Sequence, residues 1–327
     1  MNILVTGGAG YIGSHVVLAL KEKGVKVTVI DDLSTGNINL IPKEVNFLNC
    51  NINDNHKVDK LLKSESFNAV MHFAANIKVE ESVKNPKKYF INNTDNAISF
   101  FETCYKNNLT NIIFSSTAAV YGNSKTNNLI TENNDLKPLN PYGESKKRTE
   151  KYLQDNTNRF KFIILRYFNV AGADPGLRTG LVTKQASHLI KIVSEVASKK
   201  RDKVVIFGNN YNTPDGTAIR DYIHVSDLSD IHLRSLDYLL KTKESNVFNC
   251  GYGKGYSVKE VIDAANMITS NVIKYEYGKS RKGDSETLVA DVSKLKKYID
   301  WTPSYNNLNI IIKTAIAWET QLNEKNL

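Results

Sequence analysis

Short apolar runs alternate with amphipathic segments through the first half of the chain. Strands that alternate with helices build a parallel sheet with helices on both faces, so this pattern predicts a doubly wound α/β fold. The apolar runs typical of strands cover residues 3–5, 25–30, 45–48, 69–73, 112–115 and 162–165. The segments with helical spacing cover residues 13–23, 55–63, 86–107 and 141–156.

The pattern loosens in the second half of the chain. Loops rich in Gly, Pro, Asn and Asp, such as residues 173–180 and 208–216, separate shorter elements there. Short elements of this kind are expected of a smaller domain that caps the sheet. We therefore expect a parallel-sheet domain over residues 1–170, to which the chain returns around residues 217–242, and a smaller α/β domain over residues 171–327.

The composition is that of a globular protein, with 327 residues, 41% of them hydrophobic and 24% charged. No apolar run approaches the roughly 20 residues of a membrane span, and the N-terminus lacks the basic region of a secretory signal. Cys50, Cys104 and Cys250 are scattered without a CxxC spacing, which favours reduced cytoplasmic thiols and no metal site. The net charge is +9, but the lysines are spread along the chain, so we expect a solvated basic surface and no nucleic-acid partner.

A glycine-rich segment follows the first predicted strand and opens the first predicted helix. Gly7 and Gly8 suit a tight turn, Gly10 lets the backbone approach a pyrophosphate, and Gly13 lets the helix pack close to the sheet. The free N–H groups of the helix N-terminus attract phosphate. The segment predicts a dinucleotide-binding loop. A turn that binds another nucleotide, or no ligand, is the alternative.

Two acidic residues end the second predicted strand. Asp31 stands where an acidic side chain accepts hydrogen bonds from the adenosine ribose diol. Asp32 follows it, and neither has an adjacent basic residue, so a 2′-phosphate would be repelled and NAD is favoured over NADP. A turn or capping role is the alternative for Asp31.

Tyr142 and Lys146 stand four positions apart and so share one face of a predicted helix. An ammonium about 4 Å from a phenol contributes roughly 4 kcal/mol at an effective dielectric of about 20, enough to lower a phenol pKa by about three units. We expect this attraction to outweigh burial and to make Tyr142 a base near neutral pH. Thr117, just past the strand at 112–115, would relay the proton. Two exposed residues on an amphipathic helix, and a Thr turn, are the alternatives.

These motifs together resemble the extended short-chain dehydrogenase/reductase family and, within it, its epimerase-like members. The resemblance implies a Rossmann-type NAD-binding domain followed by a UDP-sugar-binding domain. It also implies reversible C4 epimerisation of UDP-glucose and UDP-galactose through a transient 4-keto sugar, with tightly bound NAD, in a cytoplasmic homodimer. The matching segments are residues 6–13, 31–33, 72–75, 81–83, 92–94, 114–122, 141–146, 165–169, 206–208, 215–217, 220–225 and 281–284.

The resemblance also implies roles for individual residues. Tyr142, Lys146 and Thr117 would be catalytic. The NAD site would comprise Gly7, Gly10, Tyr11, Ile12, Gly13, Asp31, Asp32, Asn51, Ile52, Phe73, Ala74, Ala75, Asn92, Ser115, Tyr142, Lys146 and Tyr167. The UDP-sugar site would comprise Thr117, Tyr142, Asn169, His188, Leu189, Val205, Phe207, Arg220, Arg281, Asp284 and Leu288, with Asn169 and the two arginines on the diphosphate, Phe207 on uracil and Asp284 on the uridine ribose.

Four positions depart from the family pattern. Asn51 replaces an acidic residue that contacts adenine, His188 replaces an asparagine before Leu189, and Ile77 replaces a lysine near the cofactor. Leu288 stands where a tyrosine narrows the sugar pocket in some epimerases. Because leucine is smaller, we hypothesise room for a 2-acetamido group and activity on UDP-GlcNAc and UDP-GalNAc.

Two other classes remain as alternatives. Nucleotide-sugar dehydratases and decarboxylases of the same family use acidic residues directly after the threonine, whereas Ala118 and Ala119 stand here. A protein that binds NAD without chemistry would lack the Tyr, Lys and Thr residues described above. Both alternatives are therefore disfavoured by the residues present.

Overall fold

A seven-stranded parallel sheet forms the centre of the protein in the computed structural model, which describes residues 1–122, 129–183, 186–269, 272–280 and 285–324. The strand order is β10-β6-β5-β4-β1-β2-β3, and every neighbouring pair is parallel. The order reverses between β1 and β4, which is where such sheets open a crevice for ligands. The strands are β1 (Asn2–Thr6), β2 (Lys26–Asp31), β3 (Asn46–Asn49), β4 (Ala69–His72), β5 (Asn111–Thr117), β6 (Lys161–Tyr167) and β10 (Asn246–Cys250).

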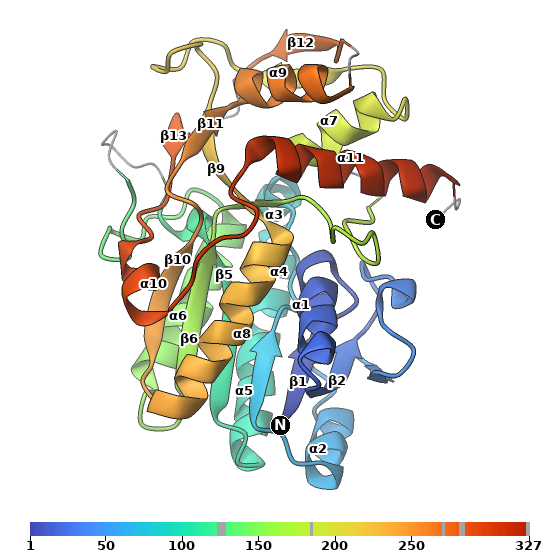
Figure 1. The fold of residues 1–327 in the computed structure, drawn as a ribbon. Coiled ribbons are helices and arrows are strands. Elements are labelled where there is room, and N and C mark those ends of the chain that lie inside the picture. Colours follow the sequence, from blue (N-terminus) through green and yellow to red (C-terminus); the bar gives the residue numbers. More distant parts are fainter. Residues whose placement is uncertain (123–128, 184–185, 270–271, 281–284, 325–327) are drawn as a thin grey trace.

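Helices cover both faces of this sheet (Figure 1). Apolar residues of α1 and α8 pack on one face, and those of α2, α5 and α6 pack on the other. The predicted doubly wound fold is therefore confirmed. The helices around the sheet are α1 (Tyr11–Glu22), α2 (Asn55–Ser64), α3 (Val79–Lys84), α4 (Pro86–Phe90), α5 (Asn96–Lys106), α6 (Pro141–Asp155) and α8 (Val225–Thr242), with short 3-10 turns at Ile38–Leu40 and Ala118–Val120.

The prediction of a single continuous helix over residues 86–107 is wrong in one respect. A π-helical turn, Ile91–Asp95, separates α4 from α5. The wider turn leaves the carbonyl of Asn93 to accept a hydrogen bond from Thr149 Oγ1 of α6 at 2.8 Å. The side chain of Asn93 also bonds Ser145 Oγ at 3.1 Å. The turn therefore ties this helical segment to α6, which carries Tyr142 and Lys146.

Most of the remaining elements lie above the carboxyl edge of the sheet, whereas α10 (Ser293–Tyr298) lies beside β10 (Figure 1). The chain passes from β6 directly into β7, which pairs with β9, so the smaller sheet is joined to that edge. No helix in the described ranges is long and apolar enough to cross a membrane. The elements are β7 (Asn169–Ala171), β8 (Val204–Phe207), β9 (Ile219–His224), β11 (Gly255–Ser257), β12 (Tyr275–Gly278), β13 (Thr287–Leu288), α7 (Leu189–Ala197), α9 (Val258–Thr269), α10 (Ser293–Tyr298) and α11 (Leu308–Glu324).

Candidate active site

The glycine loop joins β1 to α1 at the point where the strand order reverses. Gly7 has a φ of +70°, and a Cβ there would lie 2.5 Å from the backbone nitrogen of Ala74. A Cβ on Gly13 would lie 2.2 Å from the carbonyl oxygen of Gly7. The fold itself therefore requires both glycines.

Gly10 is different, because packing does not demand it. Among the described residues, the only atom that a Cβ on Gly10 would approach within 4 Å is the carbonyl oxygen of Gly7, at 3.2 Å. Gly10 is also the N-cap of α1 and makes no side-chain cap, so the first-turn N–H groups lack that partner. A small residue beside uncapped amide donors is what a pyrophosphate site needs.

The two acidic residues at the end of β2 are fixed by short hydrogen bonds. Asp31 accepts from the backbone N–H of Ala9 at 3.0 Å and of Leu33 at 2.8 Å. Burial raises the pKa of Asp31 above its usual value, while these two hydrogen bonds lower it. Asp32 accepts from Asn51 Nδ2 at 2.6 Å. Asn51 is thus held by Asp32, and the pair of carboxylates disfavours a 2′-phosphate.

Helix α6 begins where the predicted catalytic residues stand. Its N-cap, Asn140, accepts a hydrogen bond from the backbone N–H of Gly143 at 2.9 Å. Because this cap sets the first turn, Tyr142 and Lys146 lie one above the other on the helix face toward β5. Lys146 is 2% exposed, and its Nζ donates to the carbonyl oxygen of Ser115 at 2.8 Å.

Thr117 ends β5 beside the phenol of Tyr142. Its Oγ1 accepts from the backbone N–H of Ala119 at 3.1 Å, and its interaction with Tyr142 lowers the pKa of the phenol. This direction is the one expected of a hydroxyl that donates to the phenol oxygen. The structure brings Tyr142, Lys146 and Thr117 together at the carboxyl end of one strand.

The electrostatics of this group differ from the expectation in one respect. Burial raises the pKa of Tyr142, and the hydrogen bond from Thr117 lowers it. Burial also lowers the pKa of Lys146 to about 7, and the nearby Glu150 raises it. The expectation that the ammonium outweighs burial is therefore wrong, because the same exclusion of water that raises the pKa of the phenol also lowers the pKa of the neighbouring ammonium.

A second tyrosine lies close to the first. Tyr167, at the end of β6, bonds His232 Nε2 at 2.6 Å. Burial raises the pKa of Tyr167, and an interaction with the side chain of Ser115 lowers it. The ring of Phe73, just after β4, lies 5.0 Å from the ring of His232. Two residues predicted at the cofactor, Tyr167 and Phe73, therefore contact a histidine that the sequence analysis did not single out. A lone histidine on an amphipathic helix carries no pattern that would have marked it.

The other predicted cofactor residues are spread around the same edge. Tyr11 donates its hydroxyl to the carbonyl oxygen of Gly172 at 2.6 Å, and Asn92 lies in the π turn, where its Nδ2 donates to Asn93 Oδ1 at 3.0 Å. Ile52 is 5% exposed in the core, so its side chain faces away from solvent. Ile12, Ala74 and Ala75 are partly buried at the glycine loop and just after β4.

The predicted sugar-binding residues come from the smaller sheets. Leu288 of β13 stands in register with Arg220 of β9, and it packs against a cluster that contains Ala118 and Phe168. Because Ala118 directly follows Thr117, Leu288 forms a wall close to the catalytic group. Arg281 and Asp284 lie outside the described residues. Asn169 begins β7, Val205 and Phe207 lie in β8, His188 is the exposed N-cap of α7, and Leu189 is its first residue.

Comparison with known proteins identifies the family. A model of the NAD dependent epimerase/dehydratase family matches residues 3–251. The chain belongs to this family. The UDP-glucose 4-epimerase of Azospirillum brasilense is 42% identical over 99% of this chain and 93% of that protein. The enzyme of the same name from Lactobacillus helveticus is 42% identical over 97% of both.

Solved structures of epimerase/dehydratase family members are similar over the whole chain. The UDP-glucose-4-epimerase of Stenotrophomonas maltophila, with bound NAD and formylated UDP-arabinopyranose, has a TM-score of 0.96 at 31% identity and covers 99% of both chains. The UDP-Glc/GlcNAc 4-epimerase of Campylobacter jejuni has a TM-score of 0.85 at 45% identity, over 98% of this chain and 99% of that one.

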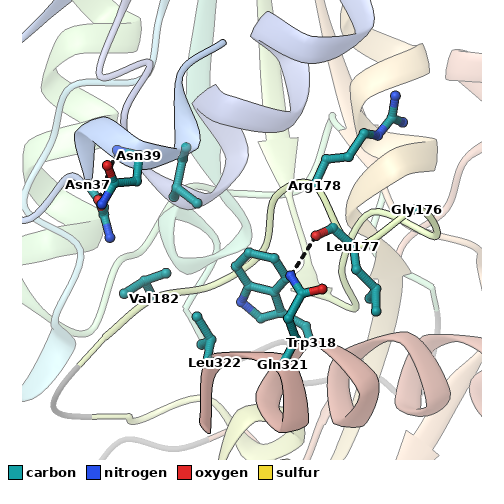
Figure 2. Close-up of a pocket in the computed structure, with 10 residues that line it drawn as sticks. Asn37, Asn39, Gly176, Leu177, Arg178, Val182, Trp318, Gln321 and Leu322 are labelled. Carbon is teal, nitrogen blue, oxygen red and sulfur yellow. Dashed lines mark hydrogen bonds between the residues drawn. The ribbon is translucent and has the colours of Figure 1, made fainter. Parts of the chain in front are cut away.

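A separate cavity of this epimerase/dehydratase family member contains none of the predicted site residues (Figure 2). It measures about 360 Å³ and lies between the turn at Ile38–Leu40, the loop at 176–182 and α11. Its polar groups bond within the chain: Gln321 Nε2 donates to the carbonyl of Leu177 at 2.8 Å, and Trp318 Nε1 donates to that of Leu181 at 3.2 Å. We assign this cavity no ligand.

Proposed function

We propose that the protein interconverts UDP-hexoses at C4, reversibly, with a tightly held NAD. The observation that carries the proposal is the meeting of Tyr142, Lys146 and Thr117 at the carboxyl end of β5, on the same edge of the sheet as the glycine loop after β1. Membership of an NAD-dependent epimerase family, and relatives named UDP-glucose 4-epimerase at 42% identity over nearly the whole chain, support it.

The residues present fit NAD. The space beside Gly10 and the uncapped first turn of α1 would hold the diphosphate, and Asp31 would hold the adenosine ribose. When bound, the oxidised nicotinamide supplies a hydride acceptor and a positive charge near the phenol. We propose that this charge acts against burial, which in the protein alone raises the pKa of Tyr142.

The chain's own part in the reaction is to move a proton and to hold the nucleotide. Tyr142 takes the proton of the sugar's 4-hydroxyl. The hydroxyl of Thr117 interacts with the phenol oxygen of Tyr142 during this step. After the 4-keto sugar has turned, Tyr142 returns the proton to the sugar's C4 oxygen. Turning requires firm contacts on the nucleotide and loose ones on the hexose. The predicted anchors serve this need, since Asn169, Arg220 and Arg281 would hold the diphosphate.

The test is to incubate the purified protein with UDP-glucose and with UDP-galactose, without added cofactor. Interconversion is the expected result, because NAD is regenerated in each cycle and stays bound. Tyr142→Phe should retain NAD and lose about 10²–10⁴-fold in kcat, the usual contribution of general acid–base catalysis. Full activity of Tyr142→Phe, or release of a 4-keto-6-deoxy sugar as in a dehydratase, would reject the assignment.

We propose in addition that the sugar pocket accepts 2-acetamido sugars. The support is Leu288, which packs against the cluster that contains Ala118, the residue after the catalytic threonine, and the similarity to an enzyme named UDP-Glc/GlcNAc 4-epimerase. A cytoplasmic location and a homodimer joined through the helices of residues 86–107 are also part of this proposal. Sedimentation equilibrium would test the dimer, with a monomeric mass as the contrary result.

A further inference from the structure

His232 lies on α8 next to Tyr167, and it has no part in the proton transfer proposed for Tyr142. It is fully buried on α8, at 0% exposure. It contacts two residues that come from separate strands, since its ring lies 5.0 Å from that of Phe73 and its Nε2 lies 2.6 Å from Tyr167 Oη. One side chain thus joins the ends of β4 and β6.

The hydrogen bonds of His232 have only one possible direction. Its Nδ1 lies 2.8 Å from the carbonyl oxygen of Leu228, which can only accept, so Nδ1 carries a proton. Burial lowers the pKa of His232 to about 4, so the ring is neutral at pH 7. The Nε2 atom of a neutral ring with a protonated Nδ1 can only accept. Tyr167 must therefore donate its phenolic proton to His232.

The direction of this hydrogen bond also determines what the oxygen of Tyr167 can do. Since the proton of Tyr167 is committed to His232, the phenolic oxygen of Tyr167 can only accept from any other group. Tyr167 also has no proton to offer Tyr142, which lies close enough for the two phenols to interact electrostatically.

We propose that His232 is a positioning residue, which fixes the hydroxyl of Tyr167 as a hydrogen-bond acceptor toward the nicotinamide end of bound NAD and leaves Tyr142, of these two phenols, as the one that exchanges a proton. The inference rests on the proposed use of NAD. It assigns His232 no contact with the substrate, because Phe73 and Tyr167 stand between α8 and the strand ends. Its effect passes through the hydroxyl of Tyr167.

The experiment compares His232→Leu with the conservative His232→Gln, whose side-chain oxygen can still accept from Tyr167. NAD affinity is measured by titration of stripped protein, together with kcat and KM for UDP-galactose. His232→Leu should bind NAD about tenfold more weakly, the effect of one lost buried hydrogen bond, and His232→Gln should stay within about threefold of the native protein. The KM should be unchanged, because His232 bonds Tyr167 and Leu228, and neither residue is a predicted anchor of the sugar site.

Tyr167→Phe provides the matched control, and it keeps the inference testable if His232→Leu does not fold. It should reproduce the tenfold loss of NAD affinity, and adding His232→Leu to it should cost less than about twofold more, since coupled residues are not additive. Native NAD affinity in Tyr167→Phe, or equal losses from His232→Leu in both backgrounds, would overturn the inference while leaving the proposed function intact. A native protein that binds no NAD would instead overturn the proposed function, and this inference with it.

Discussion

Replacing Lys146 with methionine should remove the activity and yet stabilise the protein at neutral pH. Burial lowers the pKa of Lys146 from its usual 10.5 to about 7. A basic group whose pKa is lowered by folding favours the unfolded state at every pH at which it is charged in the unfolded state. At about 1.36 kcal/mol for each pH unit between the two values, the charged lysine costs the folded state about 5 kcal/mol at pH 7.

The stabilisation produced by Lys146→Met will be smaller than the cost of the buried lysine charge. The substitution removes the hydrogen bond from Nζ to the carbonyl of Ser115, which measures 2.8 Å. An unsatisfied buried acceptor costs about 1–3 kcal/mol. Methionine has a similar length and fills the same space without charge. Lys146→Met should therefore raise the free energy of unfolding at pH 7 by roughly 2–4 kcal/mol.

The assay is urea unfolding of native and Lys146→Met protein, both stripped of NAD, because bound ligand would add its own binding energy. The cost of the lysine is full below about pH 7 and vanishes as the pH rises to 10.5. The advantage of the variant should thus be full at and below neutral pH, shrink as the pH rises above 7, and reverse near pH 10, where the cost of the unsatisfied carbonyl remains. The exposed Lys151 on the same helix is the control: Lys151→Met should change stability by under about 0.5 kcal/mol at every pH. A Lys146→Met protein less stable than the native one at pH 7 would refute the reasoning.

Three further predictions concern the glycine loop, the sugar pocket and a buried ion pair. Gly10→Ala should keep the stability of the stripped protein but weaken NAD binding about tenfold or more. Gly7→Ala should lower the free energy of unfolding by about 2–4 kcal/mol, because Gly7 has a φ of +70° and lies close to Ala74. Urea unfolding and NAD titration distinguish the two variants. Leu288→Tyr should lower kcat/KM for UDP-GlcNAc about tenfold relative to UDP-glucose, and equal failure of both proteins on UDP-GlcNAc would remove that hypothesis. Arg166→Met should lower the free energy of unfolding by about 3–5 kcal/mol, because it leaves Glu150 fully buried without its ion-pair partner. Adding Glu150→Leu to Arg166→Met should recover most of this loss. Thermal unfolding checks both variants, and a single variant as stable as the double variant would contradict the reasoning.

The first six strands could be found in the sequence because each is a short apolar run between polar or glycine-rich turns. The π turn at Ile91–Asp95 could not, since the carbonyl of Asn93 in it accepts a hydrogen bond from Thr149, which is far away in the chain. The edge strand β10 was also not among the expected strands. It pairs only with β6, and its half-polar sequence, Asn246–Cys250, resembles a loop until that pairing is known.

The candidate site shows the same division. The spacing of Tyr142 and Lys146, and the need for glycine at positions 7 and 13, are properties of local backbone geometry, so the sequence by itself determined them. The direction of the pKa change of Tyr142, and the hydrogen bonds that link Tyr167 to His232, depend on which distant segments exclude water from one place. Only the tertiary structure decides that, because the cost of burying a charge is set by everything packed around it and not by its neighbours in the chain.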